Sequence, residues 1–190
     1  KSDKEIYNAL KIGIEAFNCE SLQEIYVINE MAHVHGLKAN VSVRINPDID
    51  AHTHKYVTTG LYENKFGISQ HEFDKLIDIL KKSEHINFIG LHFHIGSQIT
   101  RVGEVFALEC QRVNDIVAYF ERNGLKVNNI NLGGGLGVDY DDPDEGAIPD
   151  FETWFRTISE NITRRDDQAV HVEPGRSLVA HCATLISRVL

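Results

Sequence analysis

The sequence predicts an α/β fold in which parallel strands are joined by helices. Short runs rich in β-branched residues alternate with longer helical patterns some five times along the 190 residues. Such alternation is typical of parallel strands connected by right-handed crossovers. Residues suited to binding gather at four of the five predicted strand ends. A doubly wound sheet and a β/α barrel both place their functional residues there, so both architectures remain open.

Each expected element follows from its local pattern. In order, they are helix 4–12, strand 14–20, helix 22–36, strand 40–47, loop 48–69, helix 70–82, strand 86–97, helix 101–123, strand 126–132, helix 150–163, strand 169–175 and an extended run over 178–190. Ser2 and Glu5 form the capping-box pattern at the first helix. The second helix has one apolar face, made of Leu22, Ile25, Ile28 and Ala32. Pro47 stops the second strand because it lacks the N–H that a ladder needs.

Composition limits the classes of function. The chain is 42% hydrophobic and 25% charged, as globular domains are. Its net charge of −9 argues against a general binder of nucleic acid or anionic membranes, which needs a basic face. No apolar run reaches the length of a membrane span. The cysteines, Cys19, Cys110 and Cys182, have no paired spacing, so we expect buried thiols in a reducing cytoplasm.

Three consecutive glycines, Gly133, Gly134 and Gly135, follow the fourth strand directly. Glycine is used where backbone must turn sharply or approach another group closely. One interpretation is a nest of backbone N–H groups around an anion such as phosphate, and the other is a permissive turn. The stretch matches neither a Walker loop nor G-x-G-x-x-G, because residue 138 is valine.

The motif EPGR follows the fifth strand. Pro174 and Gly175 favour a tight loop, and Arg176 offers a planar cation suited to phosphate or carboxylate. Glu173 occupies the last inward-pointing position, and a surface Glu–Arg pair is the alternative interpretation. An arginine and a glycine nest on consecutive strand ends resemble the phosphate site of β/α barrels, which favours phosphate.

The third strand contains GLHFHIGS. Strand periodicity puts His92 and His94 on one face, which we expect to be the inner one. The opposite face carries Leu91, Phe93 and Ile95. The H-x-H spacing also suits a metal, although a structural histidine is commoner. Ser97 donates to a phosphate oxygen or caps the following helix.

Four stretches together resemble the barrel domain of the fold-type III pyridoxal-phosphate decarboxylases: RINPDIDAHTHKYVTTGLYENKFGI, GLHFHIGSQI, NLGGGLGVDY and EPGRSLVA. Within that family they are most similar to the diaminopimelate-type enzymes. The resemblance implies a cytoplasmic homodimer with its active site at the subunit interface and pyridoxal 5′-phosphate as cofactor. It implies decarboxylation of a small amino-acid substrate, meso-2,6-diaminopimelate, to L-lysine and CO2 in lysine biosynthesis, without a metal.

The resemblance also implies roles for individual residues. His94 and Glu173 would be catalytic, with His94 stacked on the cofactor ring and Glu173 paired with the pyridine nitrogen. Arg176 would hold the phosphate and also face a substrate carboxylate. Lys65 would lie nearer the subunit interface, and Arg44 would point into the barrel near the cofactor. The implied cofactor-binding residues are His94, Ser97, Gly133, Gly134, Gly135, Glu173, Pro174, Gly175 and Arg176.

The role implied for Glu173 has a physical basis. An ionised carboxylate beside the pyridine nitrogen favours the protonated ring. A protonated ring is the stronger electron sink for the carbanion that decarboxylation leaves. The related alanine racemases place a cation at this position, so Glu173 favours a decarboxylase over a racemase.

The resemblance covers only part of the family's pattern. The Schiff-base lysine motif of the first barrel strand is absent, and the chain begins without methionine, so we expect a piece of a longer protein. Residues 1–177 would hold about strands four to eight of a (β/α)8 barrel. Residues 178–190 would begin the connection to a C-terminal β domain, which carries the catalytic cysteine. Five strands alone leave two open edges, so we expect this segment to be unstable or to associate.

Several alternatives remain at the level of sequence. One is a decarboxylase of the same fold for ornithine, arginine or carboxynorspermidine. Another is a non-catalytic relative, either a cofactor carrier or a regulatory pseudo-decarboxylase. A third is a metal-dependent barrel hydrolase that uses His92 and His94.

Overall fold

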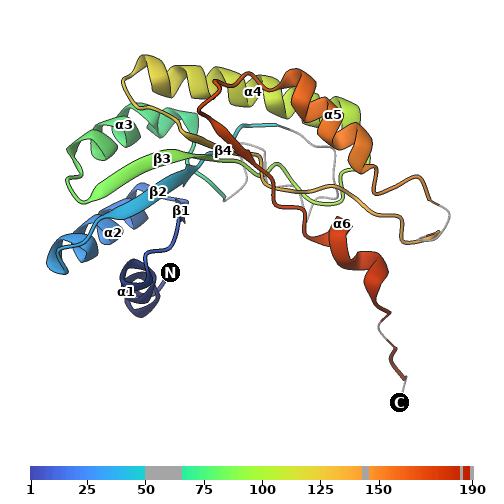
Figure 1. Cartoon of the computed structure of the whole chain (residues 1–190), viewed down its shortest axis with the longest axis horizontal. Helices are drawn as coiled ribbons and strands as arrows, with labels where there is room; N and C mark the ends of the chain where they lie inside the picture. Colours follow the sequence, from blue (N-terminus) through green and yellow to red (C-terminus); the bar gives the residue numbers. More distant parts are fainter. Residues whose placement is uncertain (50–65, 143–145, 185, 189–190) are drawn as a thin grey trace.

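The structure, a computed structural model, describes residues 1–49, 66–142, 146–184 and 186–188. Within these ranges five parallel strands form one sheet (Figure 1). The strands are β1 (Phe17–Cys19), β2 (Ala39–Arg44), β3 (Ile86–His92), β4 (Asn129–Asn131) and β5 (Ala169–His171). They pair in the order of the sequence. A doubly wound sheet reverses its order at a switch point, so this order identifies an arc of a β/α barrel.

Helices connect the strands as the sequence predicts. They are α1 (Asp3–Ile12), α2 (Leu22–Val34), α3 (Phe73–Lys82), α4 (Val102–Arg122), α5 (Phe151–Asn161) and α6 (Arg176–Val179), with 3-10 turns η1 (Gln70–Glu72) and η2 (Ala180–Cys182). The capping box of α1 is confirmed: Glu5 N–H donates to the Ser2 hydroxyl, and Ser2 N–H donates to the Glu5 carboxylate. This exchange satisfies two donors that the helix leaves unpaired.

One face of the sheet is apolar and packs against helices. It is formed by Phe17, Cys19, Val41, Val43, Leu91 and Ile130, all buried. In Figure 1, α3, α4 and α5 lie next to one another along one side of the sheet. Ring contacts join these helices, since Phe73 packs on Phe120 and Phe106 packs on Trp154. The apolar face of α2 is buried as its sequence predicts.

The other face of the sheet is polar. Residues that alternate with the apolar set line a cavity of about 250 Å³ here, together with Glu173. These inner-face residues are Asn18, Ser42, Asn129, Asn131 and His171. The inner face of a barrel carries side chains from every strand, and Glu173 is the predicted site residue that lines this cavity.

Two expectations from the sequence are wrong. The pattern predicts an extended run over 178–190, but α6 and η2 make residues 176–182 helical. Among the described residues no strand pairs with this run, and Figure 1 shows α6 and the segment after it running away from the sheet. The expectation of buried thiols fails for Cys182, which is exposed, whereas Cys19 and Cys110 are buried and burial raises their pKa to about 12.

Within the described ranges no helix is long and apolar enough to cross a membrane.

Candidate functional site

The loops that follow β3, β4 and β5 are joined by backbone hydrogen bonds. Phe93 N–H donates to the Asn131 carbonyl at 2.7 Å, and Leu132 N–H donates to the His171 carbonyl at 2.9 Å. Beyond the last strand residues, Glu173 N–H donates to the Gly133 carbonyl at 2.5 Å. The three predicted motifs HFHIGS, GGG and EPGR therefore lie side by side at one edge of the sheet.

The glycine triplet is packed between the two neighbouring loops. A Cβ atom on Gly133 would lie 2.4 Å from the Phe93 carbonyl oxygen, and one on Gly135 would lie 2.5 Å from the Gly96 carbonyl oxygen. Gly133 and Gly135 also have positive φ values of 68° and 105°, which side chains disfavour. Gly133 N–H donates to the Asn131 side chain, and Gly134 N–H donates to Nδ1 of His94. Contact with protein backbone therefore accounts for the glycines by itself.

The pKa values of both histidines of HFHIGS are lowered, which favours the neutral imidazole. His92 is buried, and neither ring nitrogen has a hydrogen-bond partner among the described residues. Burial lowers the pKa of His92, while the charge of Glu173 opposes that shift. Burial, and then the charge of Arg44, lower the pKa of His94. Both shifts favour the uncharged form of the imidazole.

Glu173 lies at the edge of the polar cavity, with its side chain 49% exposed. Its Oε1 atom accepts a hydrogen bond from Nδ2 of Asn131 at 2.7 Å. Its Oε2 atom lies 3.6 Å from Nε2 of His92. The carboxylate is thus held from β4 and faces β3, with one side open to the cavity.

Arg176 begins α6 and has partners other than Glu173. Its Nη1 atom donates to the Tyr140 hydroxyl at 2.8 Å, and its guanidinium lies 5.8 Å from the centroid of that ring. Oε1 of Gln98 is 3.5 Å away. The next residue, Ser177, is buried, and its hydroxyl has no partner among the described residues. The interpretation of EPGR as a surface Glu–Arg pair is therefore not supported.

Arg44 ends β2 and is fixed by neighbouring side chains. Its Nη1 atom donates to Oε1 of Glu20 at 2.7 Å, and its guanidinium lies 5.1 Å from the centroid of the Phe66 ring. The charge of Arg44 acts on both histidines. The side chain is thus held close to the two histidines of the third strand. Lys65 lies outside the described residues.

Sequence reasoning missed four residues that contact the predicted site: Glu20, Gln98, Asn131 and Tyr140. Asn131 shares the inward-facing positions of β4 with Asn129, and it lies two residues before the first glycine. Strand periodicity would have detected it. Tyr140 and Gln98 lie in loops, where periodicity gives no direction.

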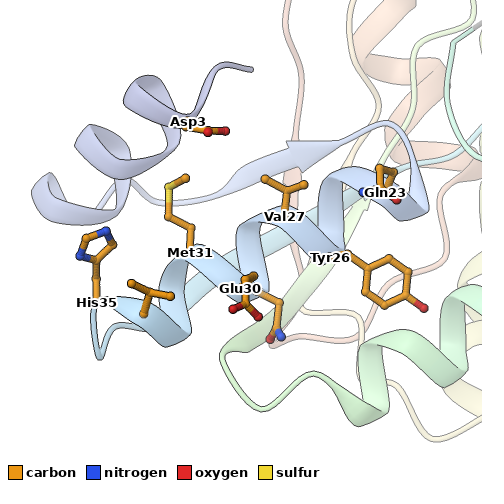
Figure 2. A pocket seen from close by; sticks show the side chains of 9 residues that line it. Asp3, Gln23, Tyr26, Val27, Glu30, Met31 and His35 are labelled. Atoms are coloured by element: carbon orange, nitrogen blue, oxygen red, sulfur yellow. The ribbon is translucent and has the colours of Figure 1, made fainter.

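A larger groove lies elsewhere in the described structure. It has a volume of about 640 Å³ and runs between α1 and α2, where Figure 2 shows Met31, Val27 and Tyr26 along its wall. None of the four sequence motifs contributes to it. Among the described residues, no group of three or more His, Cys, Asp or Glu side chains is arranged to hold a metal ion.

The sequence of this chain is similar to those of known proteins. The sequence model described as pyridoxal-dependent decarboxylase, pyridoxal binding domain, matches residues 1–180. The diaminopimelate decarboxylase of Bacteroides thetaiotaomicron is 48% identical over the whole chain, which covers 49% of that protein. The Pseudomonas aeruginosa enzyme of the same name is 39% identical over 189 residues, covering all of this chain and 44% of that protein.

A solved structure matches the fold as well. Diaminopimelate decarboxylase from Helicobacter pylori, crystallised with L-lysine, superimposes with a TM-score of 0.84 at 38% identity. The match covers 95% of this chain and 44% of that one. The chain therefore spans about half the length of the relatives it matches.

Proposed function

Because this chain belongs to the pyridoxal-dependent decarboxylases, through their pyridoxal-binding domain, we propose that it forms part of an enzyme that converts meso-2,6-diaminopimelate to L-lysine and CO2. The choice of substrate is supported by the 48% identity, over all 190 residues, to an enzyme named diaminopimelate decarboxylase. Residues 1–177 would belong to the barrel, and 178–190 would lead into a second domain. The enzyme would be a cytoplasmic homodimer with its active site at the subunit interface.

The residues at the strand ends fit pyridoxal 5′-phosphate. At one end, Arg176 provides a cation, and Ser177 has a buried hydroxyl without a partner among the described residues. We assign the phosphate to this end, together with Ser97, the glycine triplet and the Pro174–Gly175 turn. At the other end, Glu173 provides a carboxylate for the pyridine nitrogen. A cation and a carboxylate on the loop that follows β5, beside the glycine loop, would match the two polar ends of the cofactor.

When bound, the cofactor supplies the electron sink that takes up the electron pair left by departing CO2. Glu173 would hold the proton on the ring nitrogen, because an ionised carboxylate favours the charged form of a neighbouring base. His94 would lie against the ring face. Since burial lowers the pKa of His94, its imidazole adds no positive charge beside a protonated ring. Arg176 would hold the phosphate and a carboxylate of the substrate, whose other contacts come from outside this chain.

The test is product formation by the full-length protein with pyridoxal 5′-phosphate. It is offered meso-diaminopimelate, ornithine and arginine separately, and amines and CO2 are measured. We expect lysine from diaminopimelate and no turnover of the other two. Turnover of ornithine or arginine instead would overturn the substrate and leave the cofactor assignment. Cofactor binding without turnover of any of the three would point to a non-catalytic relative.

A further inference from the structure

Asn131 connects Glu173 to the glycine loop through a single side-chain amide. Its Nδ2 atom donates to Oε1 of Glu173 at 2.7 Å, and its Oδ1 atom accepts from Gly133 N–H at 2.9 Å. Among the described residues, Asn131 is the only side chain that donates a hydrogen bond to Glu173. The residue is half-buried on the inner face of β4.

The two hydrogen bonds of the Asn131 side chain have different requirements. The bond from Gly133 N–H closes a local turn of a kind that asparagine and aspartate form equally well. The bond to Glu173 spans 42 residues and requires a donor, which an ionised aspartate lacks. An aspartate would also set a second carboxylate against Glu173. The presence of asparagine rather than aspartate is therefore explained by Glu173 and not by the turn.

The surroundings of Glu173 make this neutral donor important. Its second oxygen lies 3.6 Å from the ring of His92, which has no hydrogen-bond partner in the part of the chain that the structure describes. Among the described residues, the titratable and charged side chains near this inner face are Glu15, Glu20, Arg44, His92, His94, His171 and Glu173. Of these, Arg44 is already bonded to Glu20. A hydrogen bond from Asn131 holds the carboxylate without adding a charge to this group.

We propose that Asn131 is a positioning residue that holds the Glu173 carboxylate in place and aims it into the site, and that links its position to the glycine loop. The proposal rests on the proposed function for its effect on catalysis. The contact between Asn131 and Glu173 does not depend on that function, so the two can be tested separately.

The decisive variant is Asn131→Asp in the full-length enzyme. When the introduced carboxyl group is ionised, it repels Glu173. When it is protonated, it has a hydroxyl donor and a carbonyl acceptor, as the asparagine amide has. Lowering the pH should therefore restore what the substitution removes. Asn129→Asp is the matched control, because it adds the same charge to the same strand and face, one inward-facing position away. Asn131→Ala removes both hydrogen bonds, and lowering the pH cannot restore them.

The first readout is thermal unfolding of the cofactor-free enzyme between about pH 4 and 8, because one of two adjacent carboxyl groups takes up its proton above the usual range of about 3.9–4.3. The Tm deficit of Asn131→Asp should grow as pH rises and exceed that of Asn129→Asp. A Tm deficit that does not depend on pH, or that is equal in the two variants, would contradict the proposed role of the contact between Asn131 and Glu173. This result stands whether or not the enzyme decarboxylates diaminopimelate.

The second readout is turnover of the cofactor-loaded enzyme, if the wild type forms lysine. At pH 8, kcat of Asn131→Asp and Asn131→Ala should fall by about 10- to 100-fold, the value of one hydrogen bond to a charged group, with little change in KM. The deficit of Asn131→Asp should shrink towards about pH 5.5, and that of Asn131→Ala should not. Equal deficits at both pH values would overturn the positioning role. Absence of lysine from the wild type would instead count against the proposed function.

Discussion

The carbonyl oxygen of Glu173 lies 2.2 Å from the point that a Cβ atom of Gly134 would occupy. The obstacle is backbone, which Glu173 N–H ties to the Gly133 carbonyl, so it cannot move aside cheaply. The glycine therefore sets the distance between the loops after β4 and β5, and with it the position of Glu173.

The first prediction is that Gly134→Ala separates these loops. We expect the full-length protein to lose about 1–3 kcal/mol in its free energy of unfolding, as overpacked sites do. Cofactor retention should fall with it. The measurement is denaturant unfolding, with Gly175→Ala as the control, because a Cβ atom there meets nothing within 4 Å. Equal stability of the two variants would show that the loops separate without cost.

The second prediction concerns the charge of Glu173. Glu173→Gln keeps an oxygen that accepts from Asn131, so the loop should stay in place and the cofactor should stay bound. Turnover should fall by about 10²- to 10³-fold, as it does when one electrostatic contact to the reacting system is lost. Glu160→Gln, an exposed change on α5, is the control for loss of a carboxylate. Near-normal turnover of Glu173→Gln would remove the role proposed for Glu173.

The third prediction concerns Arg176. Arg176→Ala should weaken binding of pyridoxal 5′-phosphate by about tenfold or more, because charge-assisted hydrogen bonds to phosphate contribute about 1.5–3 kcal/mol. Titration of the cofactor-free enzyme measures this directly. Arg156→Ala is the control, since Arg156 is an arginine of α5 whose side-chain partners among the described residues, Glu152 and Thr153, belong to its own helix. Unchanged cofactor affinity and unchanged KM in Arg176→Ala would show that the phosphate lies elsewhere.

The sequence was sufficient for the order of elements and for the motifs at the strand ends. Periodicity placed Leu22 and Ile25 on the buried face of α2, and both are buried. It failed after residue 176, because a short apolar run has no neighbouring strand to tell it from a helix. The segment after Gly175 is helical instead.

The contacts that complete the site could not be read from the sequence. Asn131 and Glu173 meet because β4 and β5 pair with Asn131 opposite His171, and that register depends on the whole sheet. Arg176 and Tyr140 meet across 36 residues that include α5 and β5, and Tyr140 itself lies in a loop. The motifs indicate which strand ends carry the candidate site residues, whereas the strand register determines which side chains are in contact.

The last prediction concerns Glu109, which is fully buried in α4. Neither of its carboxyl oxygens has a hydrogen-bond partner among the described residues. Burial raises the pKa of Glu109 well above its usual range. The folded protein therefore holds this proton more tightly than the unfolded chain does. The stability that the neutral acid contributes is complete below the unfolded pKa of about 4.3, and it is lost as pH rises through the folded pKa.

Glu109→Gln replaces the neutral acid by an amide of the same shape that has no proton to lose. We expect the variant and the wild type to have similar free energies of unfolding near about pH 4.5. The variant should then gain up to about 1.4 kcal/mol over the wild type for each pH unit above that, until the folded pKa is reached. Denaturant unfolding of the full-length protein at several pH values measures the difference. Glu160→Gln, which removes an exposed carboxyl, should follow the wild-type curve. If Glu109→Gln followed it too, Glu109 would have to be ionised in the folded protein, and a cation would have to lie beside it.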